Sequence, residues 1–252
     1  MLHSLEKIFE TQTIEVSHTG ERIPLHSNTS KEQGLFLQSV FDIIKPSTSL
    51  EVGFAYGIST LFILEKHREA ESSNGAHLVI EPDSYWGNAA IHNIEIEGLS
   101  AYLQIRHGYS DKILTELFHA NYRVQYAYID TTKQFDVVFM DFYFINKMLD
   151  VGGVIILDDC GGNWPGVQRV ARFINTLPHY KVLKGHGIVK NGYAKRLAQN
   201  TFSWMLDILP FKKKVYPSTS FKTDEWLGLN YSCIAFQKVA EDTRSWDWDK
   251  TF

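Results

Sequence analysis

The sequence contains very little cysteine, with only Cys160 and Cys233 among 252 residues. Two cysteines are too few for the disulfide framework of a small secreted domain, and they do not form a Cys-x-x-Cys pair. The ten histidines are scattered and show no paired spacing, which argues against a zinc site built from them. We therefore expect reduced thiols and a cytoplasmic protein.

Long apolar runs and an excess of positive charge are also missing. No run approaches the roughly 18 apolar residues of a membrane span. The first residues, MLHSLEKIFETQ, carry charges where a signal peptide would have its apolar core. The net charge is -4, whereas nucleic-acid binding needs a basic excess that neutralises phosphates. We expect neither a membrane nor a nucleic acid as a partner.

The residues that are present are typical of a globular protein. Hydrophobic residues make up 44% of the chain, which supplies enough apolar surface to offset the entropy of ordering it. The length suits one large domain, and there is no internal repeat or low-complexity linker. We therefore interpret residues 1–252 as a single domain that begins with a helical segment at residues 1–48.

Apolar stretches that favour strands alternate with stretches of helical periodicity. Strands are predicted at residues 50–53, 76–81, 103–106, 126–130, 154–157, 180–183 and 232–238. Helices are predicted at residues 30–45, 59–69, 86–98, 111–120, 137–149 and 165–177. The alternation indicates an α/β fold, a doubly wound and mostly parallel seven-stranded sheet with helices on both faces. The long stretch at 186–230, with a helical pattern at 195–209, forms an insert before the last strand, which we expect to be a lid or an interface.

A glycine turn follows the first predicted strand, in the sequence EVGFAYGIS at residues 51–59. Its glycines are four residues apart, so the backbone can approach a ligand, and the N–H groups at the helix start favour a small anion such as a carboxylate. The GxGxxG spacing expected for a pyrophosphate is absent. Glu81 ends the second strand, where it can accept hydrogen bonds from a ribose diol. A purely structural turn with a chance acid is the alternative.

Several sequence blocks in the right order resemble the class I S-adenosylmethionine-dependent methyltransferases, and most closely the small-molecule O-methyltransferase-like branch. The blocks are SKEQGLFLQSVFDIIKPSTSLEVGFAYGIST, VIEPDSYWGNAAIHNI, YIDTTKQFDVVFMDF and LDVGGVIILDDCGGNWPGV, within about residues 23–174. The resemblance implies the Rossmann-like methyltransferase fold and S-adenosylmethionine as the cofactor. It implies the methionine end at Gly53, Tyr56, Gly57 and Ser59 with Glu51 behind them, the ribose at Glu81, the adenine at Gly108, Tyr109 and Ser110, and a pocket closed by Asp130.

Three aspartates follow two of the predicted strands, Asp130 after the fourth and Asp158 and Asp159 after the fifth. The ends of parallel strands meet at one edge of a sheet, so we expect these carboxylates to lie close together. They would repel each other unless a cation binds or a pKa rises, and oxygen ligands suit Mg²⁺ or another divalent cation such as Ca²⁺. Capping of the following helices is the alternative.

Lys133 lies three residues after Asp130, in IDTTKQF. The metal-dependent O-methyltransferases of catechols carry a similar Asp-x-x-Lys, and this resemblance implies that Lys133 is the base that takes a proton from a metal-bound hydroxyl. A solvated surface lysine is the alternative. The chain departs from the closest pattern at Thr131 and Lys133, where relatives have Gly-x-His, and at Asp159, where they have Asn. These departures leave open a different substrate, a metal-free reaction or lost turnover.

Together these observations predict an S-adenosylmethionine-dependent methyltransferase that acts on a hydroxyl of a small aromatic molecule with the help of a divalent cation. We also expect a homodimer, which is common in this class. The alternatives are a cofactor-binding protein without catalysis and an NAD-dependent oxidoreductase with the same type of sheet.

Overall fold

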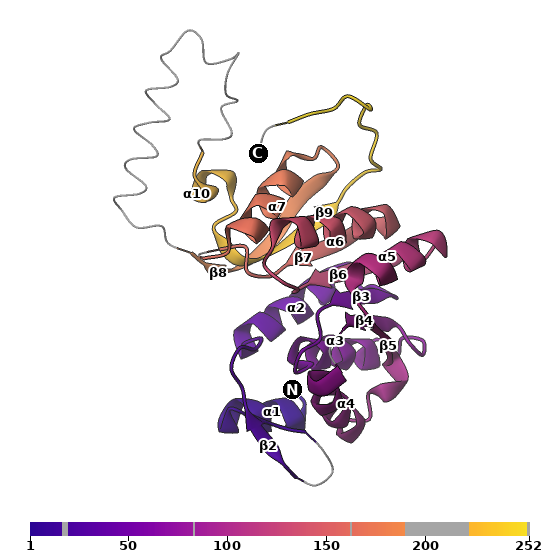
Figure 1. Ribbon diagram of the computed structural model, residues 1–252, viewed down its shortest axis with the longest axis vertical. Coiled ribbons are helices and arrows are strands. Elements are labelled where there is room, and N and C mark those ends of the chain that lie inside the picture. Colours follow the sequence, from indigo (N-terminus) through magenta and orange to yellow (C-terminus); the bar gives the residue numbers. More distant parts are fainter. Residues whose placement is uncertain (17–19, 83, 162, 190–221, 251–252) are drawn as a thin grey trace.

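A seven-stranded sheet forms the centre of the molecule, and helices cover both of its faces (Figure 1). The computed structural model describes residues 1–16, 20–82, 84–161, 163–189 and 222–250. Within these residues the sheet confirms the predicted α/β fold with a mostly parallel, doubly wound arrangement. The helix predicted at 195–209, and with it most of the insert, lies outside the described residues.

The strand order of the sheet is β5-β4-β3-β6-β7-β9-β8. These strands are β3 (Ser49–Val52), β4 (His77–Glu81), β5 (Leu103–His107), β6 (Val124–Ile129), β7 (Leu149–Leu157), β8 (Tyr180–Ile188) and β9 (Tyr231–Lys238). β3 pairs in parallel with both β4 and β6, so the strand order reverses there. Ligands of such sheets bind beyond the carboxyl ends of the strands at this point. β9 is antiparallel to both of its neighbours.

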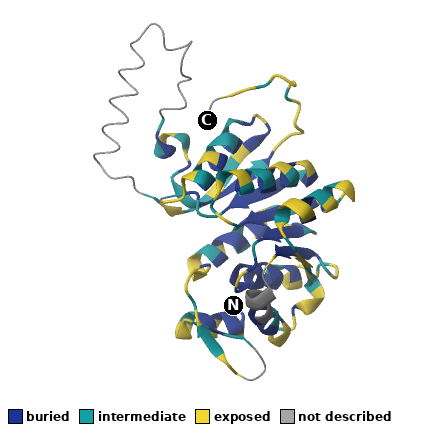
Figure 2. Cartoon of the chain, viewed as in Figure 1, coloured by how far each residue is buried: buried dark blue, intermediate teal, exposed yellow. Residues whose placement is uncertain are grey.

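Helices pack on the two faces of this sheet in separate groups. One face is covered by α2 (Lys31–Ile44), α3 (Ile58–Glu69) and α4 (Ser84–Ile96), with the short 3-10 helix η1 (Ser100–Tyr102) beside them. The other face is covered by α5 (Ser110–His119), α6 (Phe135–Met148) and α7 (Pro165–Thr176). The central strands β3, β4 and β6 are therefore almost fully buried, while the edge strands β5 and β8 and the outer sides of the helices are more exposed (Figure 2).

The segment before α2 contains more than the helices expected at residues 1–48. Helix α1 (His3–Thr11) is followed by a two-stranded antiparallel sheet of β1 (Thr13–Glu15) and β2 (Arg22–Pro24). Strands of three residues are too short to show an alternating pattern, which is why the sequence did not predict them. This hairpin contacts α1 and α4, so it extends the core on that side of the sheet.

Two strands are longer than predicted. β7 begins at Leu149 rather than at residue 154, so Gly152 and Gly153 lie inside it and not in a turn before it. The pairing of β7 with β6 shifts register in this region, which accommodates the two glycines within the strand. β8 continues to Ile188, and a short helix α10 (Asp224–Leu227) precedes β9.

The longest helices of the described residues, α2 and α6, have 14 residues each. A helix needs about 20 apolar residues to span the hydrocarbon core of a bilayer. Accordingly, none of the described helices could cross a membrane.

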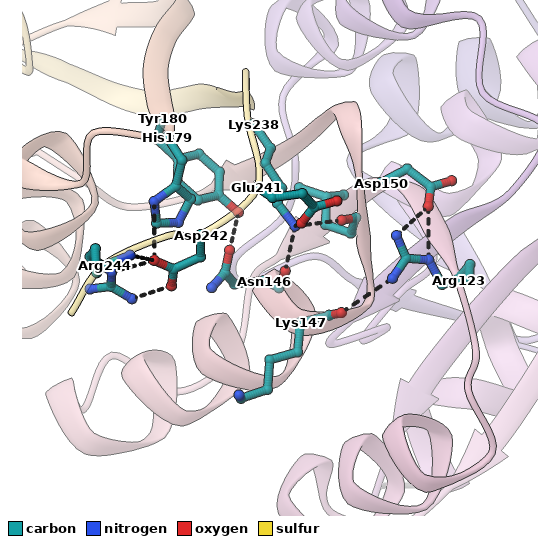
Figure 3. Close-up of polar contacts among 11 residues, drawn as sticks. Arg123, Asn146, Lys147, Asp150, His179, Tyr180, Lys238, Glu241, Asp242 and Arg244 are labelled. Carbon is teal, nitrogen blue, oxygen red and sulfur yellow. Dashed lines mark hydrogen bonds and ion pairs between the residues drawn. The ribbon is translucent and has the colours of Figure 1, made fainter. Parts of the chain in front are cut away.

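A buried lysine holds together the edge of the sheet at which β9 ends, as Figure 3 shows. Lys238 is 3% exposed, and its Nζ donates to the backbone carbonyls of Asn146 and Leu149 over 3.2 and 2.9 Å. These carbonyls lie at the end of α6, where the helix has no further N–H groups to bond them. Lys238 also forms an ion pair with Glu241 at 3.3 Å. The lysine thus joins β9 to the end of α6.

We predict that Lys238→Met lowers the free energy of unfolding by about 1–3 kcal/mol, because it leaves buried carbonyls without a donor. Urea unfolding followed by circular dichroism measures this change. Lys181→Met is the matched control, since Lys181 is an exposed lysine of β8, and we expect it to change stability by less than about 0.5 kcal/mol. Equal effects of the two substitutions would contradict the assigned role of Lys238.

Candidate functional site

The turn after β3 is shaped by a close approach between two strand ends. Gly53 follows Val52, and its φ of +97° lies in the left-handed region that favours glycine. A Cβ atom at Gly53 would lie 2.0 Å from the backbone carbonyl oxygen of Asp130. Only glycine therefore fits between the ends of β3 and β6. The turn then leads through Gly57 into α3, as predicted.

Glu51 supports this turn from behind. Its carboxylate is fully buried and accepts hydrogen bonds from the hydroxyl groups of Ser59 and Thr60, the latter at 2.6 Å. His77 Nε2 lies 3.0 Å from Oε2, the carboxylate oxygen to which Thr60 also donates. Because these partners belong to α3 and β4, Glu51 fixes the start of α3 against the sheet. It lines neither of the cavities described below, which agrees with its predicted place behind the turn.

Glu81, at the end of β4, is bonded to the same turn. Its Oε2 accepts hydrogen bonds from the backbone N–H groups of Phe54 and Ala55 over 2.8 and 3.1 Å. Ala55 has a φ of +41°, and these hydrogen bonds hold its backbone in that conformation. Glu81, which we predicted to bind a ribose, thus lies beside the glycine turn. Its carboxylate also helps to build that turn.

A cavity of about 260 Å³ lies between the turn and the beginnings of α5 and α6. Its apolar walls come from Val52, Ile80, Pro82 and Val137, and its polar lining includes Glu81, Tyr109, Ser110, Asp130, Thr131 and Thr132. The predicted adenine turn therefore contributes Tyr109 and Ser110. Gly108 lies behind them, where its N–H donates to the backbone carbonyl of Glu81 at 3.2 Å.

A larger cavity of about 660 Å³ lies on the other side of the turn. It shares Gly53, Phe54, Ala55 and Asp130 with the smaller cavity. Its other lining residues are Ser27, Asn28, Thr29, Gln33, Tyr56, Ile58, Ser59, Lys133, Asp158, Asp159, Trp164 and Ser232. One continuous space is thus lined by Tyr56 and Ser59, which we predicted at the methionine end of the cofactor. The three predicted aspartates line the same space.

The three predicted aspartates do come together in this cavity. One carboxylate oxygen from each of Asp130, Asp158 and Asp159 lies within 4.8 Å of the other two. Burial and then the neighbouring aspartates raise the pKa of Asp158 to about 7. Burial also raises the pKa of Asp130, against the lowering effect of Lys133. A set of carboxylate oxygens suits an oxygen-preferring cation such as Mg²⁺, so this donor chemistry fits the predicted metal.

Lys133 is not a solvated surface lysine. Its Nζ lies 2.6 Å from Asp130 Oδ1 and 2.7 Å from Asp159 Oδ2. Burial by itself lowers the pKa of Lys133, but the two carboxylates outweigh it, and the pKa lies above its ordinary value. In this arrangement the ammonium group is the counter-ion of the aspartates.

The backbone of Lys133 is held by the start of α7. A Cβ atom at Gly166 would lie 2.3 Å from the carbonyl oxygen of Lys133, so the first turn of α7 packs directly on this loop. The Pro165-Gly166 pair at the start of α7 therefore has a packing role. It fixes the loop, while the Lys133 side chain extends toward the acidic cluster.

Sequence reasoning missed the contribution of α2 to this cavity. The Ser30 side chain caps α2 by accepting from the backbone N–H of Gln33 at 3.1 Å. The side chain of Gln33 donates instead to the Tyr128 hydroxyl at 3.0 Å, and this hydroxyl donates to Asp158 Oδ2 at 3.1 Å. The pattern Ser-x-x-Gln is typical of a capping box, and the sequence alone gives no sign that this glutamine reaches the cavity.

Asp141 of α6 is a second residue that the sequence did not reveal. It is fully buried, and its Oδ2 accepts from the Thr131 hydroxyl at 3.2 Å. Burial raises its pKa to about 6, which hydrogen bonds from the hydroxyl groups of Ser110 and Thr131 only partly offset. Ser110 and Thr131 both line the smaller cavity, so Asp141 lies behind two of its walls.

Comparison with known proteins agrees with this geometry. Residues 50–160 match the model of a family described as a methyltransferase domain. This range includes the ends of β3 and β6, between which Gly53 lies. Over these residues the chain is therefore similar to a methyltransferase domain. A search of curated protein sequences gave no match.

Solved methyltransferase structures share the fold. An O-methyltransferase from Bacillus cereus in complex with SAH is 23% identical, with a TM-score of 0.57 over 71% of this chain and 81% of that chain. The O-methyltransferase TomG from Streptomyces achromogenes, in complex with SAM, is 15% identical, with a TM-score of 0.58 over 74% and 83%. A SAH-bound methyltransferase from Podospora anserina is 17% identical, with a TM-score of 0.52 over 62% and 74%. At these identities the likeness shows the fold.

We predict that Gly53→Ala weakens the binding of S-adenosylhomocysteine by at least about tenfold, because the added methyl group collides with the Asp130 carbonyl. Isothermal titration calorimetry measures the affinity. Gly98→Ala is the control, since Gly98 has a φ of +68° but open space around it. We expect it to cost about 1 kcal/mol of stability and to leave the affinity unchanged. An unchanged affinity in Gly53→Ala would contradict the assigned turn.

We also predict a pH effect from Asp141. Its pKa of about 6 in the folded protein lies above the ordinary value of 3.8, so the folded state holds this proton to higher pH than the unfolded chain does. The stability it contributes is present below about pH 4 and is lost as the pH rises toward 6, by up to about 3 kcal/mol.

Urea unfolding between pH 4 and 7 tests this prediction in Asp141→Asn, which cannot ionise. We expect this variant to lose less stability over that range than the unsubstituted protein. Asp136→Asn, an exposed position on the same helix, is expected to keep the original pH dependence. Parallel curves for Asp141→Asn and the unsubstituted protein would show that burial of Asp141 is not the cause.

Proposed function

We propose that this methyltransferase moves the methyl group of S-adenosylmethionine to a hydroxyl of a small aromatic molecule, assisted by a divalent cation. The observation that carries the proposal is the meeting of the two cavities at Gly53, Phe54, Ala55 and Asp130. A donor bound across this shared wall would present its reactive end to the acidic cluster.

The smaller cavity suits the adenosine part of the donor. Its side chains from Val52, Ile80 and Val137 offer apolar surface to a base. We assign Glu81 to the ribose and Tyr109 and Ser110 to the surroundings of the adenine, with Gly108 behind them. The methionine end is assigned to Gly53, Tyr56, Gly57 and Ser59, supported by Glu51, and the pocket is closed by Asp130.

The larger cavity suits the acceptor. Trp164 lines it with a side chain that is 46% exposed and can offer a ring face to an aromatic molecule. Asn28, Thr29 and Gln33 supply hydrogen-bonding groups from the N-terminal side. We propose that these residues select the acceptor, because they are separate from the assigned donor contacts.

Methyl transfer itself asks little covalent help from the protein. The acceptor oxygen forms a bond to the methyl carbon while the carbon–sulfur bond breaks, and its electrons remain on sulfur. The protein has to hold the two reactants in line about 3 Å apart and to remove the hydroxyl proton. The negative charge of Asp130 and its neighbours favours the positively charged donor over the neutral product.

Asp130, Asp158 and Asp159 would hold the cation, which stabilises the ionised form of the acceptor hydroxyl when it is bound. Lys133 is proposed as the base that receives the hydroxyl proton. This role requires a neutral amine, whereas the carboxylates of Asp130 and Asp159 favour the ammonium form. The relation between Lys133 and the cation therefore decides how the site works.

We further propose a cytoplasmic homodimer. Cys160 and Cys233 are both free and buried, as expected for reduced thiols. Apolar or aromatic side chains exposed on the surface, including Ile43, Tyr143 and Trp226, are available to a second copy. Size-exclusion chromatography with light scattering measures the assembly directly.

Measurements of ligand binding and turnover distinguish the proposed function from two alternatives, an NAD-dependent oxidoreductase and a cofactor-binding protein without catalysis. Binding of S-adenosylhomocysteine in preference to NAD is expected of this methyltransferase and not of an oxidoreductase. Tight S-adenosylhomocysteine binding without transfer to any member of a broad acceptor panel would instead indicate a cofactor-binding protein without catalysis.

The direct test is transfer of a radiolabelled methyl group to catechol-type acceptors, with and without EDTA. We predict turnover that EDTA removes and that added Mg²⁺ restores. Lys133→Met is expected to lower kcat by about 100-fold, because the base is lost, and to change S-adenosylhomocysteine affinity by less than about threefold, since Lys133 does not line the smaller cavity.

Lys7→Met removes a lysine that forms a 3.0 Å ion pair with Glu15 in the N-terminal segment, and it is the matched control with unchanged kcat. Turnover that persists in EDTA would contradict the proposed assistance by a divalent cation. Full activity of Lys133→Met would contradict the assignment of Lys133 as the base.

A further inference from the structure

The acidic cluster already contains a cation, the ammonium group of Lys133. Its Nζ is within hydrogen-bonding distance of two of the three aspartates, at 2.6 Å from Asp130 Oδ1 and 2.7 Å from Asp159 Oδ2. The third carboxylate, of Asp158, is held by the Tyr128 hydroxyl instead. Two of the three carboxylates that a metal would need are therefore already paired with the lysine.

We propose that Lys133 and a divalent cation are alternative counter-ions of these three carboxylates, so that metal binding displaces the Lys133 ammonium group. This inference rests on the proposed function and deepens it, because it concerns the same site. Two positive groups that share the same oxygen ligands within a few ångströms repel each other strongly in a partly buried cavity. One of them has to leave when the other binds.

The structure offers a way for the lysine to leave. The Lys133 backbone is fixed by the first turn of α7 at Gly166, but its side chain is 22% exposed, and the four-carbon stem of a lysine can adopt other rotamers. The side chain also lines the larger cavity, where the acceptor is proposed to bind. Displacement would therefore free the amine from Asp130 and Asp159 and leave it beside the acceptor.

Charge explains why either counter-ion can stabilise the cluster. With Lys133 in place, one positive charge faces three acidic groups, and a divalent cation in the same place neutralises one charge more. Without a metal, the ammonium group keeps the carboxylates from repelling each other. The cluster thus keeps its arrangement in both states, and metal binding need not rebuild the loops.

The test is binding of Mn²⁺ to the full chain without acceptor, followed by the electron paramagnetic resonance of free Mn²⁺ and by calorimetry. We expect Lys133→Met and Lys133→Gln to bind Mn²⁺ at least about tenfold more tightly than the unsubstituted protein, because the competing charge is gone. Lys133→Arg keeps the charge and is expected to gain no affinity. Lys7→Met, which removes a lysine paired with Glu15 elsewhere, is expected to bind Mn²⁺ as the unsubstituted protein does.

Adding Asp159→Asn to Lys133→Met locates the binding, since it is expected to reverse the gain. Equal or weaker Mn²⁺ binding in both neutral variants would overturn the competition, and so would an equal gain in Lys133→Arg. Absence of Mn²⁺ binding in every variant would overturn it as well.

These outcomes are distinct from a failure of the proposed function. The donor assignment is tested separately by S-adenosylhomocysteine binding, which involves the smaller cavity. Acceptor choice is tested by turnover. A variant that binds Mn²⁺ more tightly while the protein turns over no catechol would support the exchange at Lys133 and contradict the assigned acceptor.

Discussion

The carbonyl oxygen of Asp130 lies where a side chain on Gly53 would have to be, and this contact organises the whole site. It brings the ends of β3 and β6 so close that the glycine turn and the acidic loop share one wall. The two cavities therefore meet at the residues that both strands contribute. A larger residue at position 53 would separate the donor turn from the aspartates, and the site would become two unrelated pockets.

The same turn depends on buried polar groups that are fully bonded. β3 is only four residues long, yet it buries Ser49 and Glu51 completely. The Ser49 hydroxyl lies 2.6 and 2.7 Å from ring nitrogens of His67 and His77, and His77 continues the chain to Glu51. Burial, and then the neighbouring His77, lowers the pKa of His67 to about 3, so this ring is neutral at physiological pH. A satisfied network of this kind fixes one arrangement of the strand and helix, since every alternative leaves a buried polar group unpaired.

Much of this architecture could be predicted from local sequence. Strands buried on both faces are near-continuous apolar runs, so β4 and β6 were found within two residues of their observed ends. The glycine turn, Glu81 and the aspartates were found because strand ends in a parallel sheet meet at one edge.

Features that depend on contacts between residues far apart in the sequence could not be predicted in this way. Gln33 contacts Tyr128, 95 positions away, and nothing in the periodicity of α2 distinguishes this glutamine from a capping residue. The pairing of Lys133 with Asp159 joins the loops after β6 and β7, so it depends on a side-chain direction that spacing does not reveal. The hairpin of β1 and β2 is stabilised by its packing on α1 and α4 rather than by its own short pattern.

The antiparallel direction of β9 has a consequence for the connection between β8 and β9. Because β8 ends and β9 begins at the same edge of the sheet, the Val189 N–H can donate to the Asn230 carbonyl at 2.8 Å and tie the two flanks together. Whatever sequence is inserted between such tied flanks leaves the sheet pairing undisturbed, and a longer loop adds only a slowly growing entropic cost. The length of this connection can thus change while the pairing of β8 with β9 stays as it is.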